Sequence, residues 1–121
     1  MLTKRILIVD DDESVAALER RLLEKEGFQV EVARDGAEGL ERIKSDRYDA
    51  IISDFEMPQM KGDQLYLEVN SLSEDLAKKI IFVSGDINQF IQSTGNWFLS
   101  KPFSTKALVK LVKDFLRHKG I

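Results

Sequence analysis

Short apolar segments alternate along this chain with stretches of helical periodicity, and the alternation limits the fold more than any other feature. Residues 6–9, 50–53 and 80–83 are nearly continuous apolar runs, which is typical of strands buried on both faces. Residues 30–33 alternate between apolar and polar positions, and residues 97–99 form a short apolar segment after turn signals. Because parallel strands need crossover connections, strands separated by helices predict an α/β fold with a doubly wound parallel sheet.

The helical segments have recognisable ends and faces. In the first, Val15, Leu18 and Leu22 recur at helical spacing and are predicted to face the core, whereas Glu19 is predicted to face water. Only a brief helix, around residues 87–92, fits between the fourth and fifth strands. Residues that predict helix starts or stops are Asp12, Gly27, Asp35, Gly36 and Ser104.

Polar residues follow four of the predicted strands at the point where each strand ends. Asp10 and Asp11 follow the first strand, Asp54 the third, Ser84 the fourth and Lys101 the fifth. The carboxyl ends of parallel strands lie at one edge of a sheet, and ligands of open α/β sheets bind there. We therefore predict that these side chains form one site.

The residue types at this edge suit phosphoryl transfer. Crowded carboxylates repel one another unless a cation neutralises them, and an all-oxygen cluster favours Mg²⁺. A carboxylate beside Mg²⁺ can attack a phosphoryl group and form an aspartyl phosphate. Lys101 would supply positive charge and Ser84 a hydroxyl donor for the charge spread over the transferring group.

Composition excludes several other classes of protein. The formal net charge is -3, so a nucleic-acid-binding surface, which needs a basic excess, is not expected. The chain has no cysteine, which excludes disulfides, thiol catalysis and zinc–thiolate sites. No apolar run is long enough for a membrane segment, and we expect a cytoplasmic location.

Four ordered motifs carry a resemblance to a known family. They are ILIVDD at residues 6–11, SDFEMPQMKG at residues 53–62, VSG at residues 83–85 and KPF at residues 101–103. Together they resemble the motifs of response-regulator receiver domains, the phosphoacceptor domains of two-component signalling. The similarity extends over essentially the whole chain, so we expect residues 1–121 to form one receiver domain.

The resemblance implies a flavodoxin-like five-stranded parallel sheet of order 2-1-3-4-5 with five helices and a cis Lys101–Pro102 bond. The phosphoacceptor would be Asp54, assisted by Ser84 and Lys101, with Phe98 as an aromatic switch. The implied Mg²⁺ ligands are Asp10, Asp11, Asp54 and the backbone carbonyl of Glu56.

The resemblance also implies partners. A histidine kinase or a phosphotransfer protein would donate the phosphoryl group, and an unknown downstream protein would bind the switched surface. Such a domain is not an enzyme in the ordinary sense, because it promotes only its own phosphorylation and dephosphorylation. Residues 90–99 are similar to receivers fused to hybrid histidine kinases.

One spacing departs from the family. Lys101 follows Ser84 by 17 positions, which is shorter than usual and predicts a shortened fourth helix. Since that helix normally contributes to the family's dimer surface, the departure puts a standard dimer in doubt. The acidic residues Glu56 and Asp86 occupy positions that tune phosphoryl lifetime in the family, and the sequence does not give the direction of their effect.

Two alternatives remain open at this stage. One is a scaffold with a receiver's shape that acts without phosphorylation. The other is a phosphatase of the haloacid-dehalogenase type, in which Asp10 would be the nucleophile; the acidic motif expected after Lys101 and the room for a cap domain are missing. Substitution of Asp54 separates the three, because it abolishes labelling only in a receiver.

Overall fold

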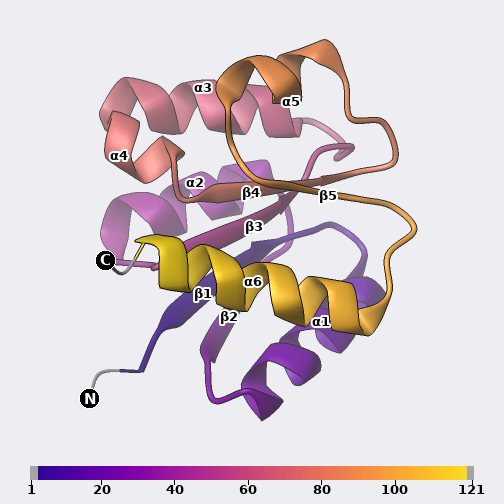
Figure 1. The fold of residues 1–121 in the computed structure, drawn as a ribbon. Coiled ribbons are helices and arrows are strands. Elements are labelled where there is room, and N and C mark those ends of the chain that lie inside the picture. The colour runs from indigo at the N-terminus through magenta and orange to yellow at the C-terminus, as the bar shows by residue number, and fades with distance from the viewer. Residues whose placement is uncertain (1–2, 120–121) are drawn as a thin grey trace.

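A computed structural model describes residues 3–119, which form a single parallel sheet flanked by helices (Figure 1). The strands are β1 Arg5–Val9, β2 Gln29–Ala33, β3 Ala50–Asp54, β4 Ile80–Ser84 and β5 Phe98–Ser100. Their order in the sheet is β2-β1-β3-β4-β5, which confirms the predicted topology. The ends of the predicted domain, residues 1–2 and 120–121, lie outside the described residues.

Helices connect successive strands. They are α1 Glu13–Lys25, α2 Gly36–Ser45, α3 Gly62–Leu72, α4 Glu74–Ala77, α5 Gln89–Thr94 and α6 Thr105–Lys119. The predicted short helix between β4 and β5 is α5, with six residues. The expected number of five helices is wrong, because α4 is an additional turn within the described residues. Ser73 ends α3 in an extended conformation, and its hydroxyl oxygen then accepts a hydrogen bond from the Leu76 N–H at 3.2 Å, which starts α4.

Two apolar layers cover the two faces of the sheet (Figure 1). Leu7 and Val9 of β1 pack with residues of α2, α3, α4 and α5 on one face. Ile6 and Ile8, which point the other way, pack with residues of α1 and α6. Because the central strands are buried on both faces, they read as continuous apolar runs in the sequence.

Helix ends follow the capping residues that the sequence contains. The Asp12 carboxylate accepts hydrogen bonds from the Ser14 and Val15 N–H groups. Asp35 and Ser104 accept the corresponding bonds at the starts of α2 and α6. These contacts fix where each helix begins, directly after a strand or loop at the carboxyl edge of the sheet.

The predicted orientation of α1 is wrong in part: Leu22 packs against the core as predicted, but Leu18 is exposed and Glu19 is buried. The buried residues of the helix are Ala16, Glu19 and Leu23, whereas Leu18 is 47% exposed. The three buried residues are separated by three and four positions, so they lie on one face of the helix. The small side chain of Ala16 packs in the apolar layer against the sheet, and Glu19, on the same face of the helix, is 3% exposed.

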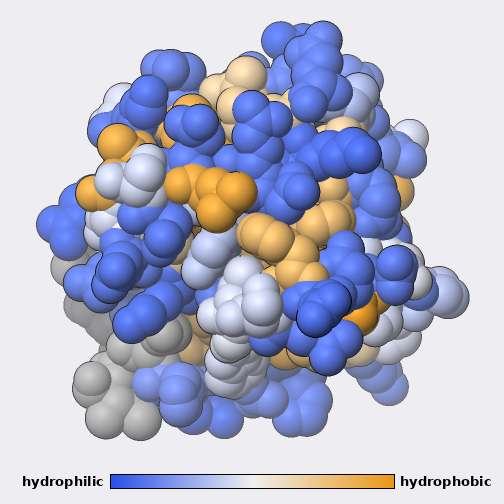
Figure 2. All heavy atoms as spheres, turned by 90° about the horizontal axis from the view of Figure 1, so that it is seen from above, coloured by the Kyte–Doolittle hydropathy of each residue, from blue (hydrophilic) through white to orange (hydrophobic). Residues whose placement is uncertain are grey.

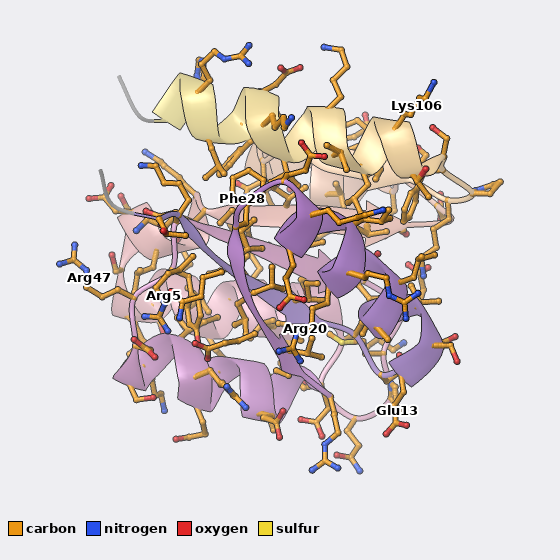
Figure 3. The ribbon with its side chains drawn as sticks, turned by 90° about the horizontal axis from the view of Figure 1, so that it is seen from below. Arg5, Glu13, Arg20, Phe28, Arg47 and Lys106 are labelled. Atoms are coloured by element: carbon orange, nitrogen blue, oxygen red, sulfur yellow. The ribbon has the colours of Figure 1, made fainter. Side chains whose placement is uncertain are left out.

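An ion-pair network ties together the amino edge of the sheet, where the strands begin. The guanidinium of Arg5 binds the carboxylates of Glu31 and Asp46 and lies 5.1 Å from the centre of the Tyr48 ring. The Tyr48 hydroxyl donates to Glu31 at 2.8 Å, and the Arg5 N–H donates to Asp49 at 2.8 Å. Figure 3 shows Arg5 on the side of the molecule opposite Glu13 and Lys106, residues at the beginnings of α1 and α6.

The outer face formed by α3 and α5 is largely polar. Figure 2 shows this face, where blue residues surround a few separate apolar patches. Leu67 and Leu72 of α3 are the large apolar side chains most exposed among the described residues, at 56% and 52%. Within residues 3–119, no helix is both long enough and apolar enough to cross a membrane.

Candidate functional site

The carboxyl edge of the sheet brings together residues that are far apart in the sequence. Asp54 ends β3 and Ser84 ends β4, while Asp10 follows β1 directly and Lys101 follows β5 directly. Since all five strands are parallel, these residues emerge on one side of the sheet. The same side carries the starts of α1 and α6 (Figure 3).

Three carboxylates form a compact acidic cluster at this edge. One oxygen from each of Asp10, Asp11 and Asp54 lies within 4.8 Å of the others. Asp10 and Asp54 are buried, at 5% exposure each, whereas Asp11 is exposed. The pKa of Asp10 is raised to about 6, chiefly by burial and also by the neighbouring charges of Asp54 and Asp11. The Asp12 N–H, which donates to Asp10 at 2.9 Å, and the charge of Lys101 partly offset this rise.

Lys101 contacts one of the two buried carboxylates, that of Asp54. Its Nζ donates to Asp54 Oδ1 at 3.0 Å, and this ion pair is the only contact between a cation and the acidic cluster in residues 3–119. Burial raises the pKa of Asp54, although the hydrogen bond from Lys101 opposes it. Burial lowers the pKa of Lys101, but the hydrogen bond and charge of Asp54 outweigh it and leave that pKa raised.

Local backbone contacts hold these groups in place. The Lys101 N–H donates to the Ser84 carbonyl at 2.8 Å, next to the predicted cis Lys101–Pro102 bond. The loop after Asp54 folds back so that the Gly62 N–H donates to the Phe55 carbonyl at 3.0 Å. A Cβ at position 62 would lie 2.8 Å from the Phe55 Cα, so this close approach requires glycine.

The Ser84 hydroxyl has partners in the unmodified protein that the sequence did not predict, and its role toward a phosphoryl group remains a prediction. The hydroxyl donates to the side-chain carboxylate of Glu56 and accepts the Asp86 N–H at 3.0 Å. The Gly85 N–H donates to the other oxygen of Glu56 at 3.2 Å. This side-chain contact of Glu56 was not predicted, and the sequence contains no signal for it.

Phe98 lies away from the acidic cluster. It pairs with Phe82 in the β4–β5 ladder, two positions before Ser84 pairs with Ser100, and it is 43% exposed. Its ring therefore faces outward along β5, and its assignment as a switch remains a prediction.

The acidic cluster fits a hard divalent cation. Its donors are carboxylate oxygens alone, with no histidine or cysteine, and Mg²⁺ prefers such oxygens together with water. Burial is the main cause of the raised pKa of Asp10, and the charges of Asp54 and Asp11 add to it despite the opposing charge of Lys101. A cation here would offset the repulsion between these acids.

Comparison with known proteins places this geometry in a family. The family model for the response regulator receiver domain matches residues 6–113. The chain belongs to that family. Receiver domains are signalling domains of two-component systems, so the resemblance drawn from the four motifs is confirmed.

Relatives and solved structures agree with the assignment. This receiver domain is 34% identical over 119 residues to the response regulator MprA of Mycobacterium ulcerans (strain Agy99), covering 96% of this chain and 51% of MprA. The chain thus spans about half the length of the curated relatives it matches.

Two solved structures are similar throughout. A CheY-like receiver domain protein from Methanospirillum hungatei JF-1 is 30% identical, with a TM-score of 0.89 over 98% of both chains. The signal receiver domain of a signal transduction histidine kinase from Syntrophus aciditrophicus is 30% identical, with a TM-score of 0.86 over 96% of this chain and 92% of that one. Both likenesses confirm the fold.

Proposed function

We propose that this receiver domain accepts a phosphoryl group on Asp54 and that the modification changes its surface for a downstream protein. The observation that carries the proposal is the 3.0 Å contact between Lys101 Nζ and Asp54 Oδ1 beside the acidic cluster. A buried carboxylate with both a cation partner and two neighbouring acids is poorly explained by packing alone.

In the proposed transfer step, the residues that act on the phosphoryl group all lie at the carboxyl edge. A carboxylate oxygen of Asp54 forms a bond to phosphorus while the bond between phosphorus and a donor nitrogen breaks, and the nitrogen leaves with the electron pair. The donor in this proposal is the phosphohistidine of a histidine kinase or phosphotransfer protein. Lys101 holds the transferring oxygens by charge, and water later hydrolyses the acyl phosphate to restore the carboxylate.

The proposal assigns Mg²⁺ to Asp10, Asp11, Asp54 and the backbone carbonyl of Glu56. When bound, Mg²⁺ would neutralise the acids and the phosphoryl oxygens. Asp10 and Asp11 act in this scheme by holding charge, not as nucleophiles. Phe98 and Ser84 respond to the new negative charge, which is about two units. We also infer that residues 1–121 are one domain, either alone or within a longer regulator or hybrid kinase.

Phosphorylation by a small donor tests the proposal. The protein is incubated with acetyl phosphate, with and without Mg²⁺, and its intact mass is measured beside an Asp54→Asn control. We expect one added phosphoryl group that needs Mg²⁺ and disappears in the variant. If no adduct forms and beryllofluoride also fails to bind, the protein is a scaffold with a receiver's shape. Labelling that persists in Asp54→Asn and is lost in Asp10→Asn would indicate the phosphatase chemistry instead.

A further inference from the structure

The carboxylate of Glu56 binds two hydrogen-bond donors at the end of β4. The Ser84 hydroxyl donates to Oε2, and the Gly85 N–H donates to Oε1 at 3.2 Å. A serine hydroxyl has one proton to donate. The Asp86 carbonyl is also within reach at 2.8 Å, but a carboxylate is the stronger acceptor. Glu56 therefore occupies two donors of this turn, the Ser84 hydroxyl and the Gly85 N–H.

These two donors lie beside the proposed phosphoacceptor. Asp54 pairs with Val83 in the β3–β4 ladder, so Ser84 and Gly85 follow directly at the carboxyl edge. On the other side, the Lys101 N–H donates to the Ser84 carbonyl at 2.8 Å. A phosphoryl group on Asp54 would carry spread negative charge at this edge and would require donors of this kind.

We propose that Glu56 is a resting-state latch, which holds the Ser84 hydroxyl and the Gly85 N–H until a phosphoryl group takes them. The inference rests on the proposed function, since it concerns phosphorylation of Asp54. Glu56 and the phosphoryl group are both anionic acceptors, and the two donors cannot serve both at full strength. Part of the interaction energy of the phosphoryl group is consequently used to displace Glu56, so the latch disfavours phosphorylation and the switched conformation.

A cleft beside Glu56 has room for the displaced carboxylate. The cleft has a volume of about 250 Å³ and is lined also by Phe55, Met57, Lys61, Asp86 and Asn88. Lys61 provides a positive charge there, which offsets the negative charge of Asp86, and Asn88 lies at the start of α5. Release of Glu56 into this cleft would change contacts around the start of α5, and would thereby connect Asp54 to the surface near that helix.

Charge repulsion between Glu56 and the phosphoryl group would also disfavour phosphorylation, so the test has to separate repulsion from the latch. Repulsion depends on the charge of Glu56 alone, whereas the latch acts through Ser84 and Gly85. A double-mutant cycle between Glu56 and Ser84 distinguishes them, because coupling appears only if the two residues act together. Asp86 offers a matched control: it is an exposed acid on the same loop, and its side chain has no hydrogen-bond partner within residues 3–119.

The experiment measures beryllofluoride affinity and the rate of labelling by acetyl phosphate, both in saturating Mg²⁺. We expect Glu56→Ala to raise both by about three- to thirty-fold, the range for one or two hydrogen bonds released from competition. In the Ser84→Ala background the same substitution should have an effect of about two-fold or less. Asp86→Ala should change both quantities less than Glu56→Ala does. Equal effects of Glu56→Ala in the two backgrounds, or of Asp86→Ala and Glu56→Ala, would overturn the latch.

A second measurement does not depend on phosphorylation. Hydrogen exchange of the Gly85 amide is followed by NMR in the unmodified protein without Mg²⁺. Glu56→Ala should speed this exchange by several-fold relative to the wild-type protein, because the amide loses its acceptor. An unchanged rate would overturn the latch even where labelling of Asp54 is normal. Failure of the wild-type protein to take any phosphoryl group or beryllofluoride would instead overturn the proposed function, so the two failures are distinguishable.

Discussion

Three carboxylic acids in this receiver domain are buried, and their surroundings differ. Asp10 and Asp54 lie at the carboxyl edge, where Lys101 is close and a cation has oxygen ligands available. Glu19 lies on the face of α1 that packs against the sheet, is 3% exposed, and forms no ion pair among the described residues. Burial is the largest cause that raises its pKa, to about 8, and the charges of Asp10 and Asp54 add to the effect.

Glu19 should make the stability of the protein depend on pH. Its pKa rises from 4.5 in the unfolded chain to about 8 in the folded protein, so the folded state binds this proton more tightly. Its contribution is complete below pH 4.5 and is lost as the pH rises toward 8, by up to about 3 kcal/mol at pH 7. Glu19→Gln should therefore unfold in urea at a higher midpoint than the wild-type protein at pH 7.5, with a smaller difference at pH 5. The same difference at both pH values would contradict the prediction.

Loss of Lys101 should slow phosphoryl transfer without weakening cation binding. Lys101→Ala removes the charge that contacts Asp54, so we expect labelling by acetyl phosphate to slow by about 100-fold. Mg²⁺ affinity should stay the same or rise, because a positive charge leaves the neighbourhood of the acids. Stopped-flow labelling and a Mg²⁺ titration measure the two effects. Lys106→Ala, at an exposed lysine of α6, is the control and should change neither.

At the scale of elements, the short connection between β4 and β5 depends on one buried amide. Asn96 is 8% exposed, and its Nδ2 donates to the carbonyls of Ala77 and Ile80, each at 2.8 Å. It thus joins the segment after α5 to the end of α4 and the start of β4. Gly95, in a left-handed conformation with φ of 74°, ends α5 just before it. These contacts compensate for the small apolar area that a six-residue helix can bury.

Asn96→Ala should consequently destabilise the protein by about 1–3 kcal/mol, since two buried carbonyl groups lose their donor. Urea unfolding followed by circular dichroism measures the change. Ser93→Ala, at an exposed position of α5, serves as the control and should shift the free energy of unfolding by less than about 0.5 kcal/mol. A loss of stability no larger than that of the control would show that solvent replaces the Asn96 hydrogen bonds.

The sequence predicts strands better than helix orientation or side-chain contacts. Apolar runs buried on both faces, such as residues 80–83, are unambiguous, and the order of the sheet followed from the family motifs. The rotation of α1 was missed because Ala16 is a weaker apolar signal than Leu18, although it is Ala16 that lies against the sheet. The contact between Glu56 and Ser84 joins residues 28 positions apart, one in the loop after β3 and one at the end of β4, and no local pattern determines the conformation of that loop.

For the whole molecule, the carboxyl edge concentrates negative charge that folding brings together. Unfolding would separate Asp10, Asp11 and Asp54, so their repulsion opposes the folded state. A cation that binds only the folded arrangement should therefore stabilise the entire domain by mass action.

Mg²⁺ should raise the thermal unfolding temperature of the protein. At a Mg²⁺ concentration about ten times Kd, the expected gain is about 1.4 kcal/mol, or about 3–6 °C for a domain of this size. Addition of EDTA should reverse it. Asp11→Asn should remove most of the shift, whereas Asp75→Asn, which makes the same charge change on exposed α4, should retain it. A shift of equal size in both variants would point to a non-specific effect of ionic strength.

The amino and carboxyl edges of the sheet lie on opposite sides of the molecule, which is useful for attaching the protein to a solid surface. Arg47 extends from the amino edge near Arg5, away from the acidic cluster (Figure 3). It is exposed, and the chain contains no cysteine, so Arg47→Cys would introduce a single thiol for coupling. A sensor chip prepared in this way would present every immobilised molecule with Asp54 toward the flowing solution, in one uniform orientation.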